Sequence, residues 1–307
     1  MKPAPFAYHR AHDLEDALRL LAEYGDEAKL LAGGQSLVPL LNLRLARPAH
    51  LIDIGGLIEL AYVRRDGDLL RIGALTRQSM LQESQLFKES CPLGAEAIPY
   101  IGHQAIRNRG TVGGSLAHAD PAAEWPLVLS TLGGSVVVAN AHGQRSVPAG
   151  EFFVTYLTTA LMPDEMICEI QLPVLPAHYG WSFQEVARRH GDFALVAAAA
   201  LVGLDAEERM TFVRLAWGGV GPVPEVADGV EDELLGQQPR PELLRRVAQD
   251  VAARLNPDSD LHATAEYRRS VAGVLGYRAL LTAVERARAR TGRPVGDVPP
   301  VHGRGRP

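Results

Sequence analysis

Ala32-Gly33-Gly34-Gln35-Ser36 and Thr111-Val112-Gly113-Gly114-Ser115 are the two stretches from which this fold can be inferred. Each pairs two adjacent glycines with a small hydroxyl residue. Because glycine has no β-carbon, such a backbone can approach a bulky anion and offer it N–H groups. One stretch of this kind is usually a simple turn, whereas two in one chain predict a single ligand with two phosphates, held from both sides. The sequence contains neither GxGxxG nor GxxxxGK[ST], so neither a Rossmann nor a P-loop site is indicated.

The composition excludes several classes of protein. The 307 residues, 47% of them hydrophobic, suffice for two or three domains with cores of their own. A net charge of −5 gives no electrostatic basis for binding nucleic acid or an anionic membrane. Cys91 and Cys168 are too few for a disulfide framework, a zinc site or an iron–sulfur cluster. Since no signal peptide and no membrane-spanning apolar run is found, we expect a cytoplasmic protein without an integral membrane segment.

The first 56 residues predict a small strand–loop–helix–strand unit. Apolar residues at helical spacing predict a helix over Asp13–Tyr24, with Asp13 as N-cap and Gly25 as stop. Short apolar runs at 29–32 and 51–54 predict buried strands. Between them, 37–45 is expected to form a helix or a tight turn.

Residues 57–175 predict a second unit with a different periodicity. Asp66-Gly67 is a strong hairpin signal between two strands at 61–65 and 69–74. The further expected elements are helices at 76–83 and 122–132 and strands at 135–138 and 165–172.

Two prolines within 173–179 predict a domain boundary there. The remainder, 176–290, is expected to form an antiparallel sheet and helices, with strands at 181–187, 193–204 and 210–217 and helices at 241–255 and 263–290. The Gly-, Pro- and Arg-rich end, 291–307, predicts a disordered tail. The fold class is therefore α+β.

The second glycine stretch lies in a context that favours a large, flat ligand. Small residues over 113–119 leave room against the backbone, and Asp120 and Glu124 can accept hydrogen bonds from ligand hydroxyls. Asp120 can equally cap the helix that follows. For His118, Arg107 and Arg109, ligand contact and a structural or surface role stay equally open.

At this point the sequence resembles the FAD-binding medium subunit of the molybdenum hydroxylases, the family of xanthine dehydrogenase and aerobic carbon monoxide dehydrogenase. The resemblance covers about residues 5–290. It rests on six motifs in order: AGGQSLVPLLNLRLARP (32–48), RNRGTVGGSLAHADPAAEWP (107–126), FFVTYLTTALMPDEMI (152–167), ARRHGDFALVAAA (187–199), GGVGP (218–222) and ATAEYRR (263–269).

The resemblance implies an FAD-binding domain of the vanillyl-alcohol-oxidase (PCMH) type in two subdomains, followed by a small C-terminal α+β domain. It also implies a non-covalently bound FAD and a set of contacts around it. These are Leu30, Leu31, Ala32, Gly33, Gly34, Gln35, Ser36, Leu37, Ile101, Gly110, Thr111, Gly113, Gly114, Ser115, Ala117, Glu124, Ile167 and Phe193.

Some of these positions also have an ordinary structural interpretation. Ile167 lies on a predicted strand and Phe193 follows a Gly-Asp turn, so either residue can belong to the core. Gln184 stands where some relatives carry lysine, and the missing positive charge is expected to affect the flavin potential.

The resemblance further implies an electron-transfer subunit. It would take electrons from the 2Fe-2S clusters of a small subunit, while a large molybdopterin subunit oxidises the substrate, in a dimer of heterotrimers. The acceptor is NAD⁺, a quinone or oxygen, and no acid–base catalytic residue is expected in this chain. Two alternatives stay open: a free-standing FAD-dependent reductase or oxidase on the same scaffold, and a nucleotide-binding module without redox function.

No metal site is expected in the chain itself. His9 and His12 have a spacing typical of metal ligands, but they lie in an N-terminal segment without a third ligand.

Overall fold

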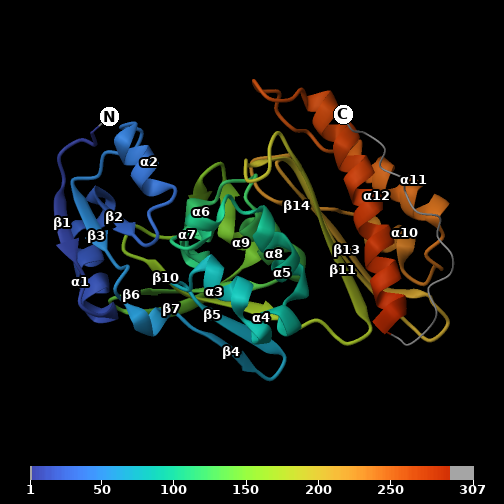
Figure 1. Ribbon diagram of the computed structural model, residues 1–307, viewed down its shortest axis with the longest axis horizontal. Helices are drawn as coiled ribbons and strands as arrows, with labels where there is room; N and C mark the ends of the chain where they lie inside the picture. Colours follow the sequence, from blue (N-terminus) through green and yellow to red (C-terminus); the bar gives the residue numbers. More distant parts are fainter. Residues whose placement is uncertain (1, 291–307) are drawn as a thin grey trace.

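Three β-sheets with their own helices follow one another along the longest axis of the molecule (Figure 1). The computed structural model describes residues 2–290. The expected tail, 291–307, lies outside these residues. No helix within 2–290 is both long and apolar enough to cross a membrane.

The N-terminal sheet is parallel, in the order β1-β3-β2. Its strands are β1 (Ala7–Arg10), β2 (Ala28–Leu31) and β3 (His50–Asp53). Helix α1 (Leu14–Tyr24) begins at Asp13, whose side chain accepts a hydrogen bond from the Asp16 amide at 2.8 Å, and buries Ala17, Leu20 and Leu21. The segment expected as a helix or turn is helix α2 (Leu37–Asn42). The predicted helix and strands are confirmed, and β1 is an additional strand.

The middle sheet is antiparallel, in the order β4-β5-β10-β6-β7. Its strands are β4 (Val63–Asp66), β5 (Leu69–Gly73), β6 (Ser135–Asn140), β7 (Gly143–Pro148) and β10 (Met166–Pro173). The hairpin predicted around Asp66-Gly67 is therefore confirmed. The central strand β10 is almost wholly buried, because helices cover the sheet in Figure 1.

Short helices connect the strands of this sheet. They are α3 (Gln78–Glu83), α4 (Gln85–Ser90), α5 (Pro92–Ala97), α6 (Gln104–Arg107), α7 (Val112–His118), α8 (Glu124–Leu132) and α9 (Ala149–Phe152), with a 3-10 turn at Ile98–Tyr100. Two further 3-10 turns lie outside this sheet, Gly25–Glu27 after α1 and Ile58–Leu60 before β4. A two-stranded hairpin, β8 (Phe153–Thr155) with β9 (Thr158–Thr159), follows α9.

The C-terminal sheet is antiparallel, in the order β11-β12-β13-β14, as expected for its three long strands. Its strands are β11 (Tyr179–Ala187), β12 (Ala194–Leu204), β13 (Met210–Gly218) and β14 (Glu225–Val226). Its helices are α10 (Val230–Leu234), α11 (Pro241–Ala252) and α12 (Ala265–Arg290).

The two faces of this sheet pack into two different hydrophobic cores. Side chains on one face therefore contact the middle unit, and those on the other contact the C-terminal helices. On β12, Ala197, Ala199 and Leu201 pack with the helices of the middle unit. The alternate residues Val196 and Ala198 pack instead with α11 and α12. Strand residues alternate between faces, so every residue of β11 can be assigned from its partner on β12.

Helix α12 ties the C-terminal sheet to the middle unit. Arg286 forms an ion pair with Glu96 of α5 (Nη2 to Oε1, 3.1 Å) and donates to the carbonyl oxygen of Trp181 at 2.9 Å. The helix lies directly on β11 at Gly180, where a β-carbon would come within 2.5 Å of the Ala287 amide nitrogen. The site described next spans this junction.

Candidate functional site

The two glycine stretches meet, although they lie far apart in the sequence. A β-carbon on Gly33 would overlap with the carbonyl oxygen of Arg109 and lie 2.9 Å from the α-carbon of Gly110. A β-carbon on Gly114 would lie 3.9 Å from that of Ala32. The structure therefore brings together the two segments that the sequence singled out.

The first stretch leaves a row of hydrogen-bond donors free. Within residues 2–290, the backbone amides of 33–37 donate to no acceptor, and the Ser36 side chain does not cap α2. Buried or half-buried N–H groups at the start of a helix are typical binding groups for phosphate. The segment can thus hold an anion through its backbone.

The second stretch uses its amides inside the protein. Val112 and Gly113 donate to the carbonyl oxygens of Thr76 and Ala74 (3.1 and 2.9 Å), and Gly114 donates to Thr111 Oγ1 at 3.1 Å. A β-carbon on Gly113 would lie 2.7 Å from that of Ala74. The second stretch thus differs from the first, because its amides already have acceptors within the protein and Gly113 packs against Ala74.

A buried acceptor without a partner lies beside the second stretch. Gln78 is buried, and its Oε1 has no hydrogen-bond partner within residues 2–290. The same atom lies 3.1 Å from where a β-carbon of Gly110 would be. An unsatisfied buried group of this kind is typical of a ligand site.

The two arginines of this region have separate structural roles. Arg107 is buried and donates to the carbonyl oxygens of Ile101 and Gly102 (2.9 and 3.1 Å) and to Gln82. It therefore holds the loop that carries Ile101 and does not face an anion. The Arg109 side chain is exposed, while its carbonyl oxygen accepts a hydrogen bond from Arg77.

The apolar candidates are divided between core and surface. Ile101 and Ile167 are buried in the core of the middle unit, with Ile167 on β10 where α7 packs. Ala117 is exposed on α7, and burial lowers the pKa of its half-buried neighbour His118. The Asp120 side chain accepts a hydrogen bond from the Ala122 amide at 2.9 Å and so stabilises the turn before α8.

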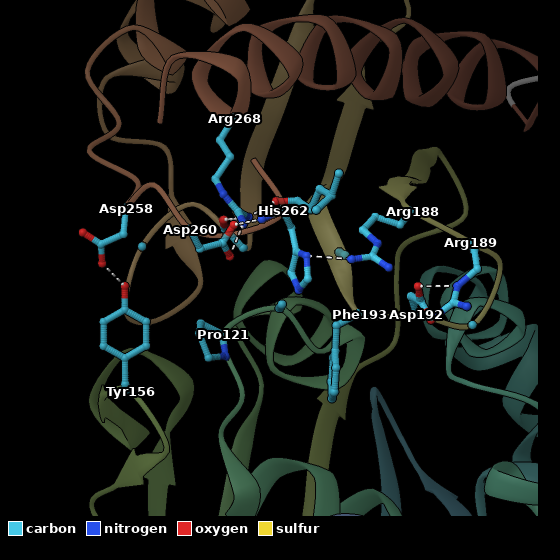
Figure 2. A pocket seen from close by; sticks show the side chains of 16 residues that line it. Pro121, Tyr156, Arg188, Arg189, Asp192, Phe193, Asp258, Asp260, His262 and Arg268 are labelled. Atoms are coloured by element: carbon cyan, nitrogen blue, oxygen red, sulfur yellow. Dashed lines mark hydrogen bonds and ion pairs between the residues drawn. The ribbon is translucent and has the colours of Figure 1, made fainter. Parts of the chain in front are cut away.

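A cavity of about 730 Å³ opens where this turn meets the C-terminal unit (Figure 2). Pro121 and Ala122 form one wall and Phe193 another. Phe193 is 57% exposed, so the alternative of a core residue is wrong. In the view of Figure 2, its ring lies between Pro121 and Asp192.

Polar contacts between distant segments enclose the cavity. Tyr156 donates to Asp258 at 2.7 Å, and Arg188 contacts His262 at 2.7 Å (Figure 2). Arg268, only 7% exposed, binds Asp260 at 2.8 Å and leaves its Nε without a partner within the described chain. Hydrogen bonds from the amides of 262 and 263 and from Arg268 lower the pKa of Asp260 to about 2.

Two acidic side chains, one buried and one half-buried, lie where the middle and C-terminal units meet. Glu124, the first residue of α8, is 5% exposed, and burial raises its pKa to about 7. Glu185 on β11 is half-buried, and burial together with the charge of Glu124 raises its pKa to about 8. Sequence reasoning missed Glu185, although the alternation of β11 indicates it.

The strand register corrects the expectation for Gln184. Gln184 pairs with Ala198, whose side chain faces α11 and α12, and donates to Ser182 at 3.1 Å. Glu185 pairs with Ala197, on the face toward the middle unit. The residue of these two that faces the middle unit is therefore Glu185, and Gln184 faces away from it.

His9 and His12 do not form a site. His9 Nε2 lies 2.9 Å from His50 Nδ1, and the His50 ring stacks on Tyr24. Within residues 2–290, no group of three His, Cys, Asp or Glu side chains is arranged to hold a metal ion.

Two family models match this chain in succession. Residues 4–175 match the FAD binding domain in molybdopterin dehydrogenase, and residues 181–283 match the CO dehydrogenase flavoprotein C-terminal domain. The chain belongs to this family of FAD subunits.

Members of the family from several bacteria align over nearly their whole length. The chain is 41% identical to the 6-hydroxypseudooxynicotine dehydrogenase complex subunit alpha of Paenarthrobacter nicotinovorans (94% of this chain, 97% of that one). It is 39% identical to the caffeine dehydrogenase subunit beta of Pseudomonas sp. strain CBB1 (93% and 97%). It superposes on a solved structure of carbon monoxide dehydrogenase from Hydrogenophaga pseudoflava with a TM-score of 0.90 and 36% identity (93% and 99%).

Membership of the family confirms the general predictions. The α+β fold with an FAD-binding domain and a C-terminal domain, the cofactor FAD and the assignment to the oxidoreductases are all established. The molybdenum and iron–sulfur centres belong to other subunits of such complexes. The residues fit FAD, because within residues 2–290 the amides of 33–37 and the buried Gln78 Oε1 have no partner, and both lie beside the second glycine stretch. The Phe193 ring is exposed for contact with a flat group.

Proposed function

We propose that this chain binds FAD and carries electrons within a molybdenum hydroxylase complex. It takes them from the 2Fe-2S clusters of a small subunit, whose large molybdopterin partner oxidises the substrate, in a dimer of heterotrimers. Bound FAD supplies the one- and two-electron redox chemistry that links such clusters to an acceptor. The single observation that carries the proposal is the row of free amides at 33–37, held against the second glycine stretch.

The chain's own residues bind and orient the cofactor. Residues 30–37 supply backbone donors to the diphosphate, and the second stretch supports them. The remaining proposed contacts are Ile101, Gly110, Thr111, Gly113, Gly114, Ser115, Ala117, Glu124, Ile167 and Phe193. They belong to a proposed FAD-binding domain at 1–175 with subdomains 1–56 and 57–175, and to a C-terminal domain at 176–290. The cytoplasm remains the predicted compartment.

The cavity beside Phe193 is where we propose that the external acceptor approaches. Its volume is about 730 Å³, it is open to solvent, and the Phe193 ring on its wall is exposed. NAD⁺, a quinone and oxygen remain the candidate acceptors.

Co-expression with the neighbouring subunit genes tests the function. We expect a yellow complex with about one FAD per copy of this chain, reduced by substrate through the clusters in stopped-flow absorbance. A colourless chain that FAD does not reconstitute would contradict both flavin functions. A stable, FAD-loaded lone chain that oxidises a substrate by itself would favour the free-standing enzyme instead.

A further inference from the structure

The guanidinium group of Arg77 lies where the two glycine stretches meet. Its Nη1 donates a hydrogen bond to the carbonyl oxygen of Arg109, which is the atom that contacts the backbone of Gly33. Its Nη2 would lie 4.0 Å from a β-carbon on Gly55, and the same β-carbon would lie 3.4 Å from the carbonyl oxygen of Ala32. The group is therefore placed beside the first residue of the first stretch and beside the turn that leads into the second.

The backbone around Arg77 fixes this position. Arg77 directly precedes α3 and forms an antiparallel bridge with Thr111. The next amide along the chain, that of Gln78, donates to the carbonyl oxygen of Gly110 at 3.0 Å. Both connections tie Arg77 to the turn before the second stretch, so its side chain cannot move away from the meeting point without breaking them.

Arg77 is half-buried and forms no ion pair with a carboxylate of residues 2–290. Asp53 is the acid whose charge acts on it, but the Asp53 carboxylate already accepts hydrogen bonds from the Tyr8 hydroxyl (2.5 Å) and the Gly55 amide (2.8 Å). Burial and the like charge of Arg109 lower the pKa of Arg77. A cation that is partly removed from water without a counter-ion is unfavourable, and a bound anion would relieve this cost.

We propose that Arg77 provides the positive charge for the diphosphate of FAD and positions the backbone that binds it. The proposal rests on the proposed function. The free amides of 33–37 are neutral dipoles, so they leave the net charge of a diphosphate uncompensated. One carbonyl group separates Arg77 from the backbone of Gly33, and across such a partly buried path a charge acts more strongly than through water.

The hydrogen bond from Arg77 has a second effect at the same place. The carbonyl oxygen of Arg109 carries a partial negative charge and lies against Gly33, next to the amides that would receive the phosphates. The charged donor on this oxygen offsets that partial charge and holds the turn in place. Lysine at position 77 would keep the positive charge but not the planar fork of two terminal nitrogens, so the two contributions can be separated.

FAD affinity as a function of salt concentration tests the charge. The FAD-free full chain is titrated with FAD, and the quenching of flavin fluorescence gives the dissociation constant. We expect Arg77→Met to bind FAD about tenfold more weakly at low salt and with a weaker dependence on salt, because salt screens the charge that the variant lacks. Arg77→Lys should recover part of the affinity and the salt dependence of the wild type. Arg65→Met is the control, since Arg65 is an exposed arginine on β4 that also donates to a backbone carbonyl, that of Gly67 at 2.9 Å.

The outcomes distinguish this proposal from the proposed function. A wild-type chain that binds no FAD would contradict the proposed function. If the wild type binds FAD, an Arg77→Met variant with the same affinity and salt dependence would overturn the role of Arg77 alone. Equal losses in the lysine and methionine variants, with the salt dependence of the wild type retained, would show that Arg77 only supports the fold.

Arginine modification provides the test if Arg77→Met does not fold. Phenylglyoxal reacts with arginine side chains, and mass spectrometry of the digested protein locates the product. In the FAD-free wild type we expect Arg77 to be modified, and ADP, which carries the diphosphate without the flavin, should protect it. Adenosine, which has no phosphate, should not. Equal modification of Arg77 with and without ADP would contradict the proposal.

Discussion

The backbone of Gly33 lies directly against the carbonyl group of Arg109, and this contact joins the two glycine stretches. Gly33→Ala would force the stretches apart, because the new β-carbon would also lie 2.9 Å from the Gly110 α-carbon. We expect FAD affinity to fall at least tenfold, which corresponds to about 1.4 kcal/mol. Quenching of flavin fluorescence on binding measures this. Gly150→Ala, where a β-carbon meets nothing within 4 Å, should bind FAD like wild type. Tight binding by Gly33→Ala would show that the contact is dispensable.

Thr111 begins α7 by accepting the hydrogen bond of the Gly114 amide. Thr111→Val keeps the shape but removes the acceptor, so we expect the free energy of unfolding to fall by about 1 kcal/mol. Urea unfolding of the FAD-free protein measures it. Thr111→Ser retains the oxygen and should lose less than the valine variant. Equal stability of the two variants would argue against the cap.

Arg107 is a buried donor to several acceptors, whereas Arg109 nearby has an exposed side chain. Arg107→Met leaves the carbonyl oxygens of Ile101 and Gly102 without that donor. We expect a loss of roughly 2–4 kcal/mol in the free energy of unfolding. Arg109→Met is the matched control and should stay within about 0.5 kcal/mol of wild type. The prediction fails if both variants are equally stable in chemical denaturation.

Phe193 contributes little to the core, because more than half of its side chain is exposed. Phe193→Ala should therefore change the free energy of unfolding by no more than about 0.5 kcal/mol. It should nevertheless shift the absorbance bands of bound flavin, if the ring contacts the cofactor. Phe152→Ala, at a fully buried position, should lose about 3–5 kcal/mol instead. An unchanged flavin spectrum in Phe193→Ala would remove this residue from the site.

The stability of the FAD-free protein should fall as the pH rises from about 5 to about 8. Glu124 and Glu185 have pKa values of about 7 and about 8 when folded, above the ordinary value of 4.5. In this range the unfolded chain has already released these protons, so the folded state binds more of them and loses stability with rising pH. Above about pH 8 the effect levels off. Denaturation of Glu185→Gln across the same range should give a shallower slope, and an equally steep one would contradict the assignment.

Local patterns predicted most of the elements correctly. The helix after Asp13 and the hairpin at Asp66-Gly67 depend on neighbouring residues, so a short window of sequence suffices. Strand β1 was not expected, because its four residues are largely exposed and it is defined by its pairing with β3, more than forty residues away.

The site was harder to predict than the fold, because its properties depend on contacts between distant segments. Both glycine stretches look alike in sequence, yet only the first keeps its amides free, since Ala74 and Thr76 accept those of the second. A one-residue difference in strand parity directs Glu185, and not Gln184, toward the middle unit. A sequence motif does not show which face of a strand a residue occupies, or which backbone amides have an acceptor in the folded protein.

Arg286 near the end of α12 forms an ion pair with Glu96 of the middle unit, and Arg268 of the same helix lines the cavity. The wall at Pro121 is synthesised long before the wall at Arg268. During translation, the cavity therefore lacks one side until the residues of α12 have been added. A chain that stops short of this helix would keep residues 33–37 but would lack the side of the cavity that Arg268 forms.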